Sequence, residues 1–200
     1  MKGQTLPKLK TSVSTTLIYN IISRVRKVHL TNEFWEDRKR FDQFLRRYSE
    51  AILENIEKVT GGKWQEAEIT IYLIPPDSPV ITIPLPLILK LRKDSLFTLH
   101  LLIHELVHRF LLVSFTEFRK EVSPEYIGLT QHEALTEYIT KVVEEKIFGK
   151  QKAQLLLKKE HSMITSRNSK ECERLVNEFE KKWDLKKHPL VWWLKHQKSA

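Results

Sequence analysis

The sequence predicts an α+β fold that is mainly helical and contains a small β-sheet of two or three strands. Long segments with apolar residues at every third or fourth position dominate the chain, which is typical of amphipathic helices. Two short segments rich in Ile, Val and Thr interrupt this pattern near the middle of the chain and indicate strands. Hydrophobic residues make up 41% of the sequence and include nine Phe and five Trp, so the chain can build a core.

The first sixty residues are expected to contain two helices. Residues 1–10 are expected to form a mobile segment at the start of the chain. Residues 13–28 carry Val, Leu and Ile at helical steps, which favours a helix, although their β-branched content leaves a strand open. A long second helix keeps the helical period throughout. Thr31 or Asn32 is expected to cap this helix, and Gly61-Gly62 marks its end.

The expected strands lie in the segment that follows. Residues 68–74 are mostly apolar and β-branched, and the prolines after them indicate a turn. A second strand then ends at Pro84 and Pro86, which is typical of a sheet edge because proline cannot donate a ladder hydrogen bond. Residues 85–92 fit no single pattern. The predicted edge strand consists of Val80, Ile81, Thr82 and Ile83.

The rest of the chain is expected to be helical apart from its connections. Residues 116–129 contain Pro124 and Gly128 and must turn the chain back between two helices. A short apolar cluster at residues 188–194 lies inside a basic tail. The expected helices occupy residues 94–115, 130–148, 151–161 and 168–183.

The helix expected over residues 94–115 contains the motif His104-Glu105-Leu106-Val107-His108. Because the two histidines are four residues apart, they lie one helical turn apart on the same face, where two imidazole nitrogens can reach one Zn²⁺ ion. Glu105 projects beside them and can accept a proton from a metal-bound water. Burying ionisable side chains in such an apolar helix costs free energy unless they have a binding partner, and a bound metal ion is such a partner. The alternative interpretation is a pair of core histidines.

A catalytic zinc site also needs a third protein ligand and an open fourth position. His100 continues the row of histidines, but it lies about 12 Å from His108 along the helix axis, too far to share one ion. We expect it to be buried or to support the ligands. Cys172 is the only cysteine and falls in a charged helix that we expect to be exposed. Neither residue is a good third ligand.

Glu133 and Glu137 are better candidates, because they lie one turn apart on the helix expected over residues 130–148. One carboxylate can complete a set of two histidines and one glutamate. The other can accept the free ring N–H of a ligand histidine and so fix its tautomer. The alternative interpretation is a solvated helix face.

The motif His-Glu-x-x-His followed by a Glu-x-x-x-Glu helix resembles the gluzincin metallopeptidases, most closely the small minigluzincins. The resemblance covers about residues 69–148. It implies a zincin-like fold in which a backing helix packs behind the sheet. It also implies that Glu133 ligates zinc together with His104 and His108, and that Glu137 supports the first histidine.

The resemblance has two departures and several functional implications. His132 stands where Asn often precedes the ligand, so it joins the residues that support the ligands, and Arg109 stands where an uncharged residue is usual. The implied function is a zinc-dependent peptidase with one Zn²⁺ ion and Glu105 as general base. Tyr126, Tyr138 or His132 could donate a hydrogen bond to the developing oxyanion.

The resemblance also suggests how a substrate would bind. The edge strand formed by Val80, Ile81, Thr82 and Ile83 could take up an extended peptide or protein substrate as a further strand. Protection of the sheet edge against aggregation is the alternative role for this strand.

Composition indicates a cytoplasmic protein. One cysteine excludes an intramolecular disulfide, and the first residues lack the apolar core of a signal peptide. No uninterrupted run of 18 apolar residues occurs, so we expect no membrane span. We expect a zincin-like catalytic domain in residues 1–150 and a basic helical extension, residues 151–200, packed on it.

The chain is basic, with a net charge of +9, and most of the excess lies near its end. From Gly149 onward there are 13 Lys and Arg against 6 Asp and Glu, a net charge of +7. This tail could occlude the site and make the enzyme latent. The alternatives are an inactive zincin-fold protein, or a basic helical module with a structural metal site that binds protein or nucleic acid. Nucleic acid is not the partner that we expect.

Overall fold

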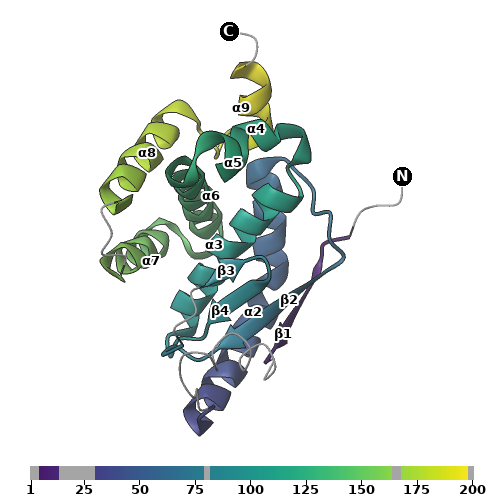
Figure 1. The fold of residues 1–200 in the computed structure, drawn as a ribbon, viewed down its shortest axis with the longest axis vertical. Helices are drawn as coiled ribbons and strands as arrows, with labels where there is room; N and C mark the ends of the chain where they lie inside the picture. Colours follow the sequence, from purple (N-terminus) through teal and green to yellow (C-terminus); the bar gives the residue numbers. More distant parts are fainter. Residues whose placement is uncertain (1–4, 14–29, 79–81, 164–167, 198–200) are drawn as a thin grey trace. The chain divides into compact units, whose positions relative to one another are not determined.

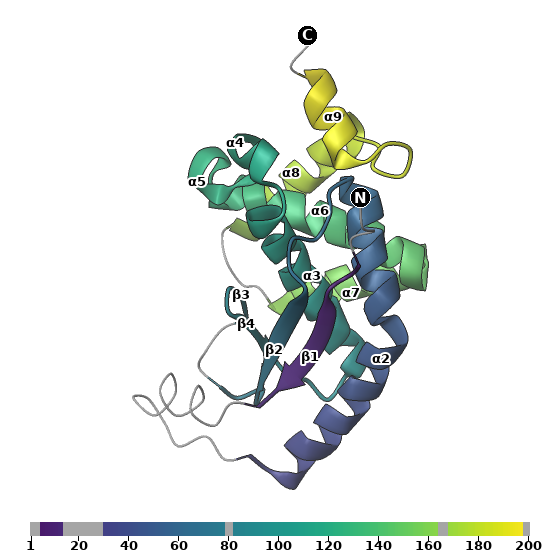
Figure 2. The ribbon, with the colours of Figure 1, turned by 90° about the vertical axis from the view of Figure 1, so that its right-hand side faces the viewer.

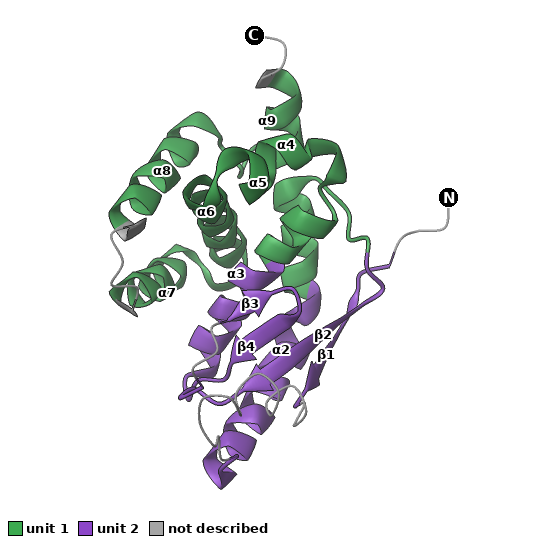
Figure 3. Cartoon of the chain, in the orientation of Figure 1, with its two compact units in different colours: residues 1–4, 51–65, 107–200 green, residues 5–50, 66–106 purple. Residues whose placement is uncertain are grey.

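The computed structural model of the protein has a mixed α+β fold that is mostly helical, with one small sheet of four strands (Figure 1). It describes residues 5–13, 30–78, 82–163 and 168–197. The chain divides into two compact units (Figure 3). Unit 2 comprises residues 5–50 and 66–106, and unit 1 comprises residues 1–4, 51–65 and 107–200. Residues 151–200 therefore group with the helices that precede them.

The sheet belongs to unit 2 and consists of β1 (Lys8–Ser12), β2 (Glu68–Ile74), β3 (Ile83–Pro84) and β4 (Leu87–Lys90), in the order β1-β2-β4-β3. β2 pairs in parallel with β1 and with β4, and β3 pairs antiparallel with β4. Alternate residues of β2 are fully buried, which marks the face of the sheet that meets the core. These residues are Ile69, Ile71 and Leu73.

Two helices contribute to unit 2. They are the first part of α2 (Asn32–Thr60) and the first part of α3 (Ser95–Val113), which lie on one face of the sheet (Figures 1 and 2). A hydrogen bond of 2.9 Å from the Thr11 hydroxyl to the Asp42 carboxylate links β1 to α2. The long helix predicted behind the sheet is therefore present, with the bounds expected from its period.

The sheet differs from the prediction in its number of strands, four instead of two or three. β1 forms where a mobile start was expected, and β4 lies in the segment that fitted no single pattern. β3 is shorter than the predicted strand, and it does lie at the sheet edge, as its proline indicated. Val80 and Ile81 lie outside the described residues, as does almost all of the helix expected over residues 13–28.

Unit 1 is built around α6 (Leu129–Phe148), which packs against α7 (Lys150–Met163) and α8 (Asn168–Lys182). The connection from α3 contains the short helices η1 (Thr116–Phe118), α4 (Arg119–Val122) and α5 (Pro124–Ile127), and α9 (Leu190–Gln197) ends the unit. The apolar residues of α6 are buried because the neighbouring helices cover more than one of its faces. They are Ala134, Leu135, Ile139, Val142 and Val143.

The end of α2 is also part of unit 1 and depends on two glycines. Gly61 has a φ of +77°, a conformation that glycine adopts without strain, and a side-chain carbon there would come within 3.0 Å of Pro189 and 3.3 Å of Val191. At Gly62, a side-chain carbon would come within 2.6 Å of the Phe115 ring. The paired glycines therefore end the helix and let Pro189, Val191 and the Phe115 ring approach the backbone closely.

The start of α3 is fixed by Asp94. Its carboxylate accepts hydrogen bonds from the backbone N–H groups of Leu96 and Phe97, at 3.0 and 3.1 Å. Asp94 thus caps the helix by satisfying N–H groups that have no partner within it.

By length and composition alone, α3 is long and apolar enough to cross a membrane. However, most of it is buried inside the protein, and core helices of soluble proteins are equally long and apolar. The apolar residues of α3 surround His104, Glu105 and His108, which are 6%, 8% and 8% exposed. This helix therefore carries the three ionisable side chains of the motif at buried positions.

Candidate metal site

α3 carries the two histidines of the motif one turn apart, as the sequence predicted. His100, one turn earlier, is fully buried and stacks on Phe97 with ring centroids 5.5 Å apart. This agrees with its expected burial.

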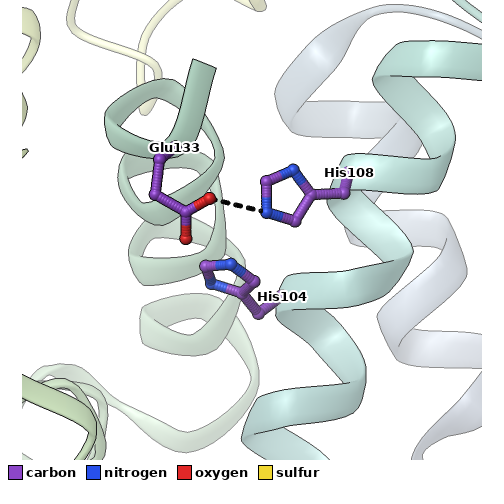
Figure 4. Close-up of side chains that lie close together, drawn as sticks. All are labelled: His104, His108 and Glu133. Carbon is purple, nitrogen blue, oxygen red and sulfur yellow. Dashed lines mark ion pairs between the residues drawn. The ribbon is translucent and has the colours of Figure 1, made fainter. Parts of the chain in front are cut away.

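Glu133 lies near the beginning of α6 and faces the histidines (Figure 4). The Nε2 atom of His108 and the Oε2 atom of Glu133 are 3.1 Å apart. Ligand atoms of His104, His108 and Glu133 all lie within 4.8 Å of one another. This group could hold a metal ion, and among the described residues it is the only group of three or more His, Cys, Asp and Glu side chains that meets this criterion.

The donor set and its spacing fit a small divalent ion. Two nitrogens and a carboxylate oxygen are common zinc ligands, and tetrahedral ligands about 2.0–2.1 Å from zinc lie about 3.3 Å from one another. The His108–Glu133 distance of 3.1 Å already matches this geometry. The upper limit of 4.8 Å exceeds it by about 1.5 Å, which a side-chain rotation can close. Imidazole nitrogens and a carboxylate oxygen suit several divalent first-row metals, zinc among them.

His132 contacts the second histidine from α6. Its Nε2 atom lies 2.9 Å from His108 Nδ1, and its Nδ1 atom lies 2.5 Å from the backbone oxygen of Val122. The Thr136 hydroxyl lies 3.1 Å from the same His108 Nδ1 atom. His132, predicted to support the ligands, is therefore in contact with one of them and is itself only 4% exposed.

Glu137 forms a second cluster, with side chains that the sequence did not connect to it. Its carboxylate lies 2.8 Å from His161 Nε2 on α7 and accepts a hydrogen bond of 3.3 Å from Cys172 Sγ on α8. Burial raises the pKa of Glu137, and the nearby His161 partly offsets this shift. Burial and the Glu137 carboxylate also raise the pKa of the Cys172 thiol.

Cys172 is buried, contrary to the exposed position expected from its charged helix. The helix is amphipathic, and Cys172 shares its buried face with Leu175 and Val176. His161 had no signal in the sequence beyond being a histidine near a helix end. Only the packing of α7 and α8 against α6 brings these side chains to Glu137.

The other predicted site residues lie in contrasting environments. Tyr126 on α5 is 52% exposed. Tyr138 on α6 is 3% exposed, and its hydroxyl donates a hydrogen bond to the backbone oxygen of Trp183. Thr82 and Ile83 are partly buried, and Ile83 belongs to the edge strand β3.

Comparisons with known proteins returned no match among family models, curated proteins or solved structures.

Proposed function

We propose that the protein is a zinc-dependent peptidase of gluzincin type in which His104, His108 and Glu133 hold one Zn²⁺ ion. The observation that carries the proposal is the group formed by these three side chains, with ligand atoms within 4.8 Å of one another. Its three-ligand composition is typical of catalytic zinc sites, which keep a fourth position open. Structural zinc sites use four protein ligands, mostly cysteines, and this chain has one cysteine.

Glu105 is the proposed general base. It follows His104 and lies three residues before His108, so helix geometry places it beside the ligand pair. When bound, zinc lowers the pKa of a coordinated water and polarises a substrate carbonyl. Glu105 would accept the proton of the attacking water and then donate it to the leaving amine.

Tyr126 remains a candidate for stabilising the oxyanion, because it is half exposed on the helix that precedes α6. Both ring nitrogens of His132 already contact protein atoms, the Val122 carbonyl and His108 Nδ1, so we leave His132 out of the chemistry. The Tyr138 hydroxyl already donates its proton to the Trp183 carbonyl, so we leave Tyr138 out of the chemistry. Binding of the substrate along β3 is also part of the proposal, since this strand lies at the sheet edge.

The proposal is tested by separating metal binding from hydrolysis. Glu105→Gln should retain zinc and lose cleavage of casein or a mixed peptide pool, because the amide cannot accept the proton. Glu133→Ala should lose the metal as well. Glu178→Gln, a change at an exposed carboxylate on α8, is the matched control and should alter neither property.

Two results would contradict the proposal. If Glu105→Gln cleaves peptides as fast as the unmodified protein, Glu105 is not the base. If the zinc-loaded protein cleaves nothing in the pool, the peptidase function is wrong for the protein as it stands, and a latent or non-enzymatic metal protein takes its place.

A further inference from the structure

We infer that one exposed face of α7 docks the protein on an anionic membrane surface. The face consists of Lys152, Leu155, Lys158 and Lys159, and we call it the lysine face. The inference is independent of the proposed metal site. It follows from the charge, the exposure and the helical spacing of these four side chains.

The four residues lie together because of their spacing. Lys152 and Lys158 are each three residues from Leu155, and Lys159 is four residues from it, so all four share one side of the helix. The opposite side of α7 faces α6 and carries the buried residues of the helix. These are Ala153, Leu156 and Glu160. The lysine face is therefore turned away from the protein.

The charge of this face is not offset by acidic side chains nearby. Residues 149–159 contain four lysines and no Asp or Glu, and the next residue, Glu160, is only 8% exposed. Lys152 and Lys158 are exposed, and within the described part of the chain neither forms an ion pair. By contrast, both lysines of α2 pair with glutamates of their own helix. The lysine face therefore presents positive charge to the solvent.

An exposed leucine lies in the middle of this charge. Leu155 is 66% exposed, so most of its side chain contacts water. The long side chains of the three neighbouring lysines can extend past it and place their ammonium groups in the headgroup layer of a bilayer. The leucine then enters the boundary of the acyl chains, as apolar residues of interfacial helices do. Charge and apolar surface are thus arranged as the two layers of an anionic membrane surface require.

Two other anionic partners match this face less well. Proteins that bind single-stranded nucleic acid stack its bases on aromatic side chains and Arg, and residues 149–163 contain no Phe, Tyr, Trp or Arg. An acidic protein would need a pocket shaped for Leu155 and a large complementary surface around it. A bilayer needs no complementary shape, because its apolar layer is fluid. The membrane surface is therefore the partner that the composition of the face favours.

The test measures binding of the full-length protein to lipid vesicles by cosedimentation. One set of vesicles contains phosphatidylcholine alone, and the other contains phosphatidylcholine and phosphatidylserine in equal parts. The protein should bind the anionic vesicles and not the neutral ones. Raised salt should release it, because screening weakens the attraction between lysines and headgroups.

Two variants and a control assign the binding to the lysine face. Lys152→Gln combined with Lys158→Gln should weaken binding about 25-fold, since each lysine near an anionic surface contributes about 5-fold. Leu155→Gln keeps the charge and should weaken binding about 10-fold, because a polar side chain does not enter the apolar layer. The matched control is Lys8→Gln combined with Lys120→Gln, which removes the same charge at exposed positions of β1 and α4 and should weaken binding far less.

The outcomes decide among the possible partners. The inference is overturned if the protein binds neither set of vesicles or binds both equally. Equal weakening by the two double variants would show that net charge, and not the lysine face, governs binding. If Leu155→Gln binds as tightly as the unmodified protein, the leucine does not enter the bilayer. Tighter binding to a single-stranded oligonucleotide or to poly-glutamate than to anionic vesicles would assign the face to nucleic acid or to an acidic protein instead.

Discussion

Replacing Tyr138 with Phe separates a structural hydrogen bond from a catalytic one. Tyr138 and Trp183 are 3% and 5% exposed, and the tyrosine hydroxyl donates to the tryptophan carbonyl. Removing the hydroxyl leaves this buried carbonyl without its donor, which costs about 1–3 kcal/mol of unfolding free energy. A hydroxyl that stabilised an oxyanion would instead be worth about 10²–10³-fold in kcat. We expect the loss of stability and a change in kcat of less than about 10-fold.

The pH dependence of stability gives the same variant a second readout. Burial raises the pKa of Tyr138 from 10.0 to about 12, so the folded protein keeps a proton that the unfolded chain releases. The resulting stability is fully present below pH 10 and is lost as pH rises through about 12. The loss is at most about 1.4 kcal/mol per pH unit over this range. The Phe variant lacks this ionisation, so its deficit relative to tyrosine should shrink between pH 10 and 12.

Urea denaturation at pH 7 measures the loss of stability in the Phe variant. Repeating it at steps from pH 9 to 12 measures how that loss depends on pH. Tyr126→Phe is the matched control, because Tyr126 is 52% exposed, and it should change stability by less than about 0.5 kcal/mol. A Tyr138→Phe variant as stable as the unmodified protein at pH 7 would contradict the structural role of this hydrogen bond. A deficit independent of pH up to 12 would refute the assigned ionisation.

Two further substitutions test how the helices are ended and begun. Gly62→Ala should destabilise the protein by about 1–3 kcal/mol, since its new methyl group would lie within 2.6 Å of the Phe115 ring. A melting temperature equal to that of the unmodified protein would show instead that the ring moves freely. Asp94→Ala should lower the free energy of unfolding, measured by chemical denaturation, by about 1 kcal/mol because α3 loses its N-cap. Asp94→Asn should retain most of the stability, and equal losses in both variants would rule out capping as the cause.

The helices could be predicted closely from the sequence because the residues that define each helix and its ends lie within it or next to it. α2, α3 and α6 each keep an apolar period of three to four residues between clear end signals, such as Asp94 before α3 and Gly149 after α6. Such signals act within one or two turns. The predicted bounds therefore lie within two residues of the observed ones.

The strands were harder to predict because their partners are distant in sequence. β1, with the sequence Lys-Leu-Lys-Thr-Ser, has little apolar character and is a strand because it pairs with β2, sixty residues later. β4 is only four residues long and is flanked by prolines and charged residues. Neither segment can be assigned as a strand from its own residues until its pairing partner is known.

For the candidate site, the sequence predicted the group that lies on regular helices and missed the contacts made between helices. His104 and His108 follow from four-residue spacing and ligand chemistry, whereas the choice of Glu133 over Glu137 came from the resemblance to the gluzincins. The ligand atoms of His104, His108 and Glu133 do lie close together. The bond between His132 and the Val122 carbonyl depends on where α4 lies, which no periodic pattern encodes. The cluster of Glu137, His161 and Cys172 likewise requires three helices to be packed first.

The most direct measurement is the zinc content of the purified protein after incubation with Zn²⁺ and removal of excess metal, compared with that of Glu133→Ala. We expect one zinc ion per chain in the unmodified protein and far less than one in the variant, which lacks a proposed ligand on α6. A protein that retains no zinc, or a variant that retains a full equivalent, would contradict a metal site built from His104, His108 and Glu133.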